Sequence, residues 1–245
     1  MDRLVVLILS SLLGLVPLLA FGQKLEEDII PTSAGDLKIT FIGHSSLILT
    51  FGDKVIHVDP VTSEGNYKEL PQADLILITH DHFDHFDPAA LKILKKDTTI
   101  IVGPASCQSK VQDLKVMKNG DRLNLLGLDI EAVPAYNLVH KRPDGQPFHP
   151  RGAGNGYVIT FGDKRVYIAG DTENIPEMKN LKNIDIAFLP MNLPYTMTPE
   201  MVAEAARWIK PGILYPYHYG DTNTSRLVTL LKDVPEIEVR IRHMK

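Results

Sequence analysis

Residues 79–85, Thr-His-Asp-His-Phe-Asp-His, concentrate side chains that bind metal ions. Four potential ligands fall within this segment: His80, His82, Asp84 and His85. Alternate side chains of an extended backbone point the same way, so we expect His80 and His82 on one side. A turn at Phe83 would bring the other two round to the same space. Imidazole nitrogens suit Zn, Fe or Mn, and a carboxylate helps to neutralise the cation. The spacing therefore predicts two ligands for one metal ion and two for a neighbouring ion.

Two later positions offer further ligands. Asp171 follows an expected strand at Val166–Ile168, and His218 follows another at Gly212–Tyr215. The first cluster likewise ends an apolar run, Asp74–Thr79, that is typical of a strand buried on both faces. A carboxylate such as that of Asp171 can bridge two cations and, with a bridging hydroxide, offset much of their charge.

The order of these ligands resembles the metallo-β-lactamase superfamily from about Lys38 to the C-terminus. The motifs that carry the resemblance are His80-x-His82-x-Asp84-His85, Gly170-Asp171-Thr172 and the late His218. Further motifs resemble the branch that contains ascorbate-6-phosphate lactonase-like and N-acylphosphatidylethanolamine phospholipase D-like proteins: Gly43-His44-Ser45-Ser46, Val58-Asp59-Pro60 and Pro194-Tyr195-Thr196-Met197. The resemblance implies that His80 and His82 bind the first metal ion. The ligands that it implies for the second ion are Asp84, His85 and His218, with Asp171 as the bridge.

One departure from the superfamily pattern concerns the first metal ion. A third histidine usually follows the strand that ends here near Val133, but residues 134–137 read Pro-Ala-Tyr-Asn. The loop beyond offers His140 and His149. We favour His149, because the flanking Phe and Pro would hold it stiffly, whereas His140 resembles a surface residue.

Other side chains have candidate roles beside the metal ions. His44, in a Gly-His turn, is placed either at the mouth of the site, contacting substrate, or in a structural position. Tyr195 could donate a hydrogen bond to an oxyanion, as could Tyr136 and Tyr219, or each could pack. Asp59 could orient a metal-binding histidine, since such histidines donate their second nitrogen to a carboxylate or carbonyl.

The elements expected around these residues form two similar halves. Short strands at Leu37–Ile42, Ser46–Phe51 and Lys54–Val58 follow one another closely, and residues 136–156 are expected to be a long loop. Residues 49–56 resemble residues 159–166, and each hairpin is followed about twenty residues later by a buried strand. Helices are expected at Pro88–Lys95, Pro199–Ile209 and Thr224–Leu231. We therefore predict an α/β fold, a four-layer αββα sandwich of two similar halves (the metallo-β-lactamase fold).

The N-terminus differs in kind from the rest of the chain. A charged start, an apolar run from Leu4 to Phe21 and the exit Ala20-Phe21-Gly22 predict a signal peptide over residues 1–22 and export to the periplasm or beyond. The alternative is a retained N-terminal membrane anchor. Residues 23–245 are expected to form a single hydrolase domain with no stable membrane span.

The amino-acid composition restricts the kinds of molecule that the protein is expected to bind. The net charge is −4 over 245 residues, with Lys and Arg scattered, which argues against nucleic-acid binding. Cys107 is the only cysteine, so no intrachain disulfide forms, and we expect it to be buried. A small-molecule substrate is the expected partner, and no sequence feature sets an oligomeric state.

These observations favour a metal-dependent hydrolase with two divalent cations, Zn being preferred and Mn or Fe alternatives. A metal-bridged hydroxide would attack an ester, a lactone or a related bond, with Asp84 and Asp171 positioning it and accepting its proton. One alternative is a phosphodiesterase acting on lipid or nucleotide-like substrates, for which Leu138, Val139, Leu193 and Met197 could form an apolar rim. The other is a non-catalytic metal-binding module, suggested by Tyr136 at the position of the missing histidine.

Overall fold

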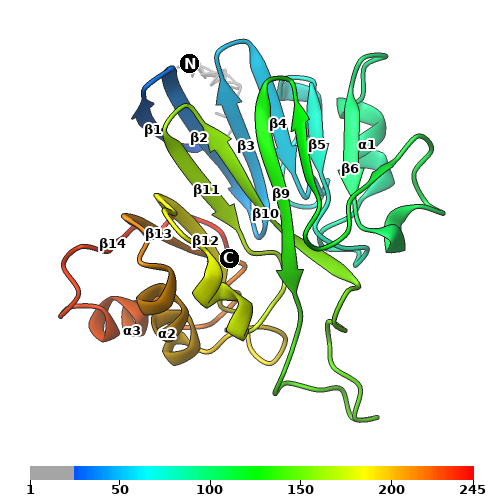
Figure 1. Ribbon diagram of the computed structural model, residues 1–245. Helices are drawn as coiled ribbons and strands as arrows, with labels where there is room; N and C mark the ends of the chain where they lie inside the picture. The colour runs from blue at the N-terminus through cyan, green and yellow to red at the C-terminus, as the bar shows by residue number, and fades with distance from the viewer. Residues whose placement is uncertain (1–24) are drawn as a thin grey trace, which may run out of the picture.

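Two seven-stranded sheets make up the centre of the computed structural model, which describes residues 25–245 (Figure 1). In spatial order the first sheet contains β1 (Glu26–Thr32), β2 (Gly35–Gly43), β3 (Ser46–Phe51), β4 (Lys54–Val58), β5 (Leu75–Leu77), β6 (Ile100–Gly103) and β7 (Lys115–Val116). The second contains β14 (Glu238–Val239), β13 (Ile213–Tyr217), β12 (Ile186–Pro190), β11 (Lys164–Ile168), β10 (Gly154–Phe161), β9 (Leu128–Ala135) and β8 (Arg122–Leu125). The predicted signal peptide, residues 1–22, lies outside the described residues.

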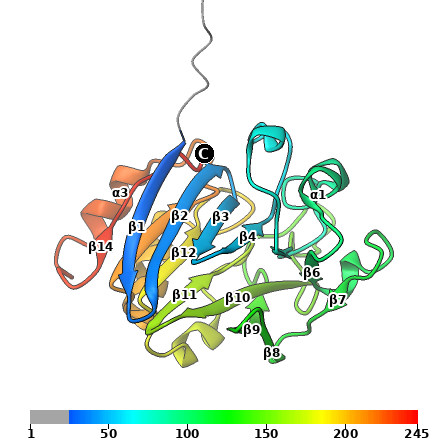
Figure 2. The same ribbon diagram turned by 90° about the horizontal axis from the view of Figure 1, so that it is seen from above.

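Helices cover the outer faces of the two sheets. Helix α1 (Pro88–Leu94) lies against the first sheet, and α2 (Pro199–Ile209) and α3 (Thr224–Leu230) lie against the second (Figure 2). Single 3₁₀ turns are found at Tyr67–Glu69, Ala105–Cys107 and Pro176–Asn180. The helices begin where the sequence provides caps: the Asp87 side chain accepts a hydrogen bond from Ala89 N–H, and Thr198 accepts one from Met201 N–H.

The layers follow from alternation along the buried strands. In β5, Leu75 and Leu77 join the core between the sheets, whereas Ile76 packs outward in the cluster that contains α1. In β12, Phe188 faces the other sheet and Leu189 faces α2. Both faces of these strands are covered, which explains their unbroken apolar sequences. The four-layer αββα sandwich is confirmed.

The two halves repeat each other in detail. In the first half, Val55 N–H donates to the Asp74 carboxylate at 2.8 Å, and Asp74 N–H donates back to the Val55 carbonyl at 2.8 Å. In the second half Arg165 and Asp185 make the same reciprocal pair, at 2.8 and 2.9 Å. Both pairs join the antiparallel hairpin to the parallel strand that follows. The similarity expected from the sequence is therefore structural.

A few elements differ from expectation. Strand β1 was not anticipated, because Glu-Glu-Asp-Ile-Ile-Pro-Thr mixes charges and a proline with its apolar residues. The expected loop at residues 136–156 is shorter, since β10 begins at Gly154. The expected helix Thr224–Leu231 ends one residue earlier, at Leu230.

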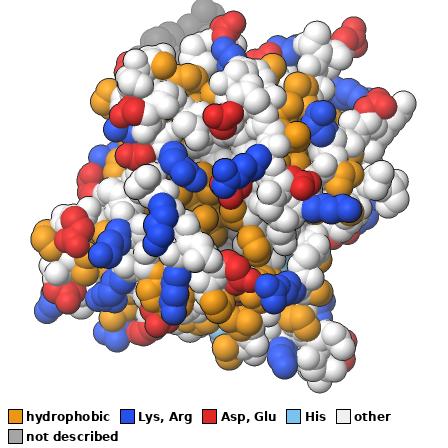
Figure 3. Space-filling view, in the orientation of Figure 1, with side chains coloured by type: hydrophobic (Ala, Val, Ile, Leu, Met, Phe, Trp, Pro, Cys, Tyr) orange, Lys and Arg blue, Asp and Glu red, His pale blue; other side chains and the backbone are white. Residues whose placement is uncertain are grey.

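The surface agrees with the composition. Basic and acidic side chains are interspersed on the face in Figure 3, and little histidine is visible there. Cys107 is buried, as predicted. Across residues 25–245, every helix is too short or too polar to cross a membrane.

Candidate metal centre

The predicted ligands follow the carboxyl ends of parallel strands from both sheets. Strand β5 runs parallel to β4 and β6, and β12 runs parallel to β11 and β13. Residues that leave such strands meet at one edge of the sandwich, the usual place for ligands in α/β folds. His80 lies beyond β5, Asp171 beyond β11, and His218 directly after β13.

Three histidines form the first group of potential ligands. One ring nitrogen of each of His80, His82 and His149 lies within 4.8 Å of those of the other two. The ring centroids are 4.6 Å apart for His80 and His82, and 5.0 Å apart for His82 and His149. The structure therefore brings His149, rather than His140, to the position that the missing third histidine would occupy.

A second group lies beside the first and contains His44, Asp84, His85 and His218, with ligand atoms again within 4.8 Å of one another. His44 was expected to contact substrate or to be structural, but its ring centroid lies 3.7 Å from that of His218. His44 and His218 both adopt left-handed backbone conformations, with φ of 50° and 46°. His218 N–H donates to the His44 carbonyl at 2.9 Å, so the two strained residues fix each other.

Asp171 lies between the two groups. Its Oδ2 is 3.1 Å from His149 Nε2 and 3.4 Å from His218 Nε2, and its Oδ1 is 3.3 Å from His85 Nε2. A third potential metal-binding group, His80, His85 and Asp171, spans the gap. The carboxylate is thus placed where a bridging ligand would lie.

The side chains around this centre fit cations. Some of the buried side-chain atoms that have no hydrogen-bond partner among the described residues belong to the predicted ligands: Nε2 of His80, His85 and His218, and Oδ1 of Asp171. Buried polar atoms are normally paired, and unpaired ones cost free energy. All of them face one centre made of imidazoles and carboxylates, a donor set suited to Zn²⁺, Mn²⁺ or Fe²⁺.

Electrostatics favour binding by most of these groups. Burial lowers the pKa of His80 well below its usual value and also lowers that of His82, which keeps both imidazoles neutral and their lone pairs free. Burial would raise the pKa of Asp171, but the neighbouring His218, His85 and His149 hold it well below the usual range. For His85, burial lowers the pKa, and Asp171 and Asp59 more than reverse that effect.

Two of the predicted ligands, His85 and His149, are oriented by contacts to Nδ1, the ring nitrogen that faces away from the centre. Asp59 Oδ2 lies 2.8 Å from His85 Nδ1, the orienting contact expected from the sequence. His149 Nδ1 lies 2.7 Å from the Asn137 side-chain oxygen. His140, the rejected alternative, has its Nδ1 2.7 Å from Glu173 Oε1, away from the other imidazoles.

The remaining candidates divide between the site and the scaffold. Tyr195 is half-exposed at the site, with its ring centroid 5.0 Å from that of Phe148. Tyr136 and Tyr219 do not serve the site: their hydroxyls donate to Glu177 and to the Arg242 carbonyl. His57 is buried against the Pro71 carbonyl, and His243 is exposed.

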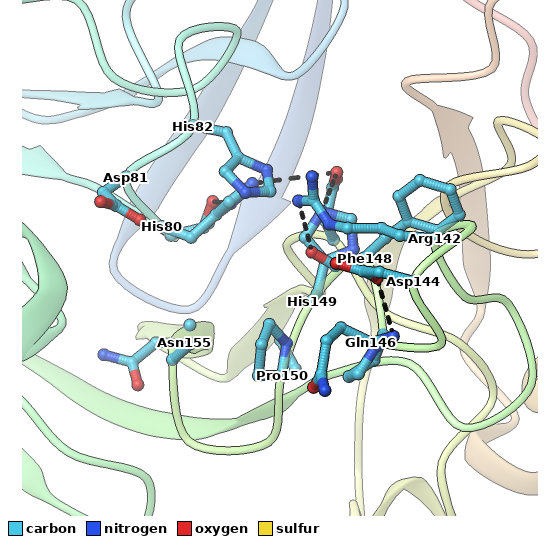
Figure 4. Close-up of a pocket in the computed structure, with 16 residues that line it drawn as sticks. His80, Asp81, His82, Arg142, Asp144, Gln146, Phe148, His149, Pro150 and Asn155 are labelled. Atoms are coloured by element: carbon cyan, nitrogen blue, oxygen red, sulfur yellow. Dashed lines mark hydrogen bonds and ion pairs between the residues drawn. The ribbon is translucent and has the colours of Figure 1, made fainter.

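A cavity of about 500 Å³ opens beside the first group (Figure 4). Figure 4 shows His80, His82 and His149 around one space, with Arg142 and Phe148 beside His149. Arg142 donates to the Phe148 carbonyl at 3.2 Å, and its guanidinium lies 5.5 Å from the Phe148 ring centre. The sequence assigns Phe148 only the role of holding His149 in place, and it assigns no role to Arg142.

Residues 38–218 match the family model described as "Beta-lactamase superfamily domain". A UPF0173 metal-dependent hydrolase from Methanopyrus kandleri is 31% identical over 197 residues, covering 75% of this chain and 84% of the relative. Another from Enterococcus faecalis is 32% identical over 189 residues, covering 73% and 84%. The chain belongs to the metal-dependent hydrolases of the metallo-β-lactamase superfamily.

Solved structures agree with this family. A protein from Parabacteroides distasonis assigned as a metal-dependent hydrolase is 51% identical, with a TM-score of 0.87 over 91% of this chain and 100% of its own. The metallo hydrolase Igni18 from Ignicoccus hospitalis, 24% identical, shares the fold with a TM-score of 0.71 over 85% and 95% of the two chains. The branch named from the sequence stays a prediction. The sequence suggested a non-catalytic module only because a third histidine of the first group was missing after β9. His149 lies beside His80 and His82, so that reason no longer holds.

Proposed function

We propose that this metal-dependent hydrolase is exported, holds two divalent cations with Zn²⁺ preferred, and cleaves an ester, a lactone or a related bond. The observation that carries the proposal is the position of Asp171 between the two ligand groups, 3.1 Å from His149 Nε2 and 3.3 Å from His85 Nε2. A single carboxylate between two imidazole-rich groups is the arrangement expected of a bridging ligand. Mn²⁺ and Fe²⁺ suit the same donor set.

When bound, such cations supply hydroxide at neutral pH and polarise a carbonyl or phosphoryl oxygen. The part of the chain itself is to orient the reactants and to move protons. Asp171 is almost fully buried and positions the attacking water, whereas the Asp84 side chain is 30% exposed and can pass a proton to solvent. Asp84 Oδ2 lies 3.4 Å from His44 Nε2, which links the carboxylate to a second proton-carrying group at the edge of the site.

Tyr195 and Phe148 form the substrate-facing wall of the pocket in this proposal. Both line a second cavity, of about 600 Å³, that shares His82, Arg142 and Phe148 with the first and is also lined by Asp84. The T-shaped contact between the Tyr195 and Phe148 rings holds an apolar surface beside the ligand groups, and Arg142 adds a positive charge. This wall suits a substrate that has both an apolar part, which would contact the rings, and an anionic group, which would face Arg142.

The second candidate function is hydrolysis of phosphodiesters in lipid-like substrates. It is favoured by a rim of exposed apolar side chains around the site. Exposed large side chains are found in the metal-binding motif and in the loops around it: Phe83, Leu138, Val139, Leu193 and Tyr195. Phe83, within residues 79–85, is 86% exposed, and exposed apolar side chains that gather around one site can mark a binding surface. Met197, expected in this rim, is buried instead.

The test of the proposed chemistry is metal content per chain, measured on protein purified without added metal. Wild type and His82→Ala would be assayed on lactone, thioester and bis-aryl phosphodiester panels. About two metal ions per wild-type chain, with turnover lost in the variant, supports the proposal, and the panel identifies the electrophile. One ion or none, with no turnover after metal is supplied, contradicts it.

Export has its own test. Cells would express either the full chain or residues 23–245 behind a new start codon, and each fraction would be probed for the protein. The proposal expects the full chain outside the cytoplasm at the mass of residues 23–245, and the shortened chain inside. A full-length product in the membrane fraction would show a retained anchor.

A further inference from the structure

Glu173 is a completely buried carboxylate beside the first ligand group. Its Oε2 accepts hydrogen bonds from the backbone N–H groups of Leu138 and Val139, each at 2.7 Å. Its Oε1 accepts one from the His140 N–H at 2.7 Å and one from the Asn137 side-chain amide at 3.1 Å. Burying a carboxylate is unfavourable unless charge-assisted hydrogen bonds offset the loss of water. Four donors therefore fix this side chain and the loop that follows β9.

Asn137 connects that carboxylate to a predicted ligand. Its Nδ2 donates to Glu173 and also to the Tyr195 carbonyl at 2.9 Å, so both amide hydrogens have acceptors. The amide oxygen must then face the other way. There it accepts from His149 N–H at 2.8 Å and lies 2.7 Å from His149 Nδ1.

The orientation of the amide sets the tautomer of His149. Because an amide oxygen only accepts, His149 Nδ1 must carry the hydrogen in this contact. Nε2 is left with its lone pair, and it points to the centre, 3.1 Å from Asp171 Oδ2. Neutral imidazole with a free Nε2 is the form that binds a metal ion.

We propose that Glu173 is a positioning residue for the metal ion held by His80, His82 and His149, and that it acts through Asn137 on the tautomer and direction of His149. The inference rests on the proposed two-metal function. The second group is oriented differently, because Asp59 contacts His85 directly at 2.8 Å. Loss of Glu173 therefore weakens one metal site and spares the other.

The experiment is a titration of metal-free protein with Co²⁺, followed by visible absorption and by equilibrium dialysis, which resolve two binding steps. Glu173→Gln keeps the shape of the side chain but replaces one carboxylate oxygen with an NH₂ group. That NH₂ group would face N–H groups whose hydrogen bonds Glu173 now accepts. Glu177→Gln is the matched control, because Glu177 bonds the Tyr136 hydroxyl and Arg151 away from the centre. We expect one Co²⁺ step to weaken by roughly 10- to 100-fold in Glu173→Gln, with a changed spectrum for that ion, and no change in the control.

Asn137→Ala is the second variant, in case Glu173→Gln loosens the whole loop. It leaves the three backbone N–H groups on Glu173, and it removes the acceptor of His149 together with the amide hydrogens that bond Glu173 and the Tyr195 carbonyl. We expect the same single step to weaken. Equal weakening of both steps in Glu173→Gln, or an unchanged titration in Asn137→Ala, overturns the relay. A wild-type protein that binds no Co²⁺ overturns the proposed function itself, whereas two normal steps in every variant overturn only this inference.

Discussion

Asp59 Oδ2 lies 2.8 Å from His85 Nδ1, and both side chains are completely buried. The same carboxylate accepts hydrogen bonds from Thr79 N–H at 2.7 Å and from the Thr79 hydroxyl at 2.6 Å. Asp59 itself adopts a left-handed backbone conformation, with φ of 42°. The turn after β4 is therefore built around this carboxylate, which turns His85 Nε2 toward Asp171.

Asp59→Asn should weaken the site that contains His85. The amide keeps one acceptor but presents a donor to groups that already donate. We expect the affinity of that site to fall by roughly 10- to 100-fold. Metal titration of the variant measures this, with Asp53→Asn in the exposed turn of the same hairpin as control. An unchanged affinity would show that Asp59 supports only the backbone turn.

His149→Ala and His140→Ala should have different effects on metal content. His149 belongs to the first ligand group, so its loss should leave about one metal ion per chain at limiting free metal. His140 faces Glu173, so its replacement should leave both ions bound. Elemental analysis after dialysis against equal free metal makes the comparison. Loss of an ion in His140→Ala alone would reverse the assignment.

Glycine at position 170 is required by space as well as by conformation. Its φ is 65°, and a Cβ there would lie 2.8 Å from the Asn155 carbonyl oxygen and 3.1 Å from Thr79 Cβ. Gly170→Ala should destabilise the protein by about 2–3 kcal/mol. Gly52→Ala, with φ of 60° and open space around its Cβ, has the conformational strain without the clash and should cost less. Urea denaturation of both variants tests the difference, and equal losses would contradict it.

His57 should make stability depend on pH. Burial lowers its pKa from 6.5 to about 4, although the hydrogen bond to Pro71 opposes the shift. Between these values the unfolded chain binds a proton that the folded protein excludes, so stability falls as pH drops from 6.5 toward 4. The contribution at pH 5 is about 2 kcal/mol.

His57→Gln tests that contribution, because glutamine can still donate to the Pro71 carbonyl but does not titrate. Urea denaturation at neutral pH and at about pH 5 should show that wild type loses about 2 kcal/mol more than the variant. The other histidines contribute equally to both proteins and cancel. Identical losses would mean that His57 is protonated within the folded protein.

Tyr195→Ala should raise KM with little change in kcat, since in the proposed function the ring contacts bound substrate and takes no part in proton transfer. The aromatic contact with Phe148 suggests a rise of roughly 2- to 10-fold. Val228→Ala on α3 is a control with the same 45% exposure outside the pocket. Steady-state kinetics on the substrate found by the panel give the answer, and a selective fall in kcat would indicate a catalytic role instead.

The sequence predicted the parts of the site whose residues are close along the chain. The spacing of His80, His82, Asp84 and His85 within one short segment indicates metal binding directly. Asp171 and His218 each follow a strand that can be predicted from its apolar residues. Periodicity also predicted most strands, because a two-residue repeat or an unbroken apolar run reports directly on burial. The sequence does not reveal strand β1, because three acidic residues at its start and a proline near its end hide the pattern.

Contacts between distant residues could not be predicted in the same way. His149 joins His80 and His82 through the fold of an eighteen-residue loop (136–153), and the sequence favoured it over His140 only through its stiff neighbours. Glu173 had no signal, because its partners are backbone N–H groups of that loop, which every residue except proline possesses. Met197 looked like a rim residue, yet it packs in the core beneath α2.

The division of the protein into two similar halves affects how it unfolds. Neither half contains a complete centre: residues 80–85 belong to the first half, and Asp171 and His218 belong to the second. Cations that bind only when both halves are in place would stabilise the packing of one half against the other, so their release would lower the stability of the folded chain. Chelation should therefore lower the temperature at which the chain unfolds, and because the two sheets share one core the halves should unfold in the same transition.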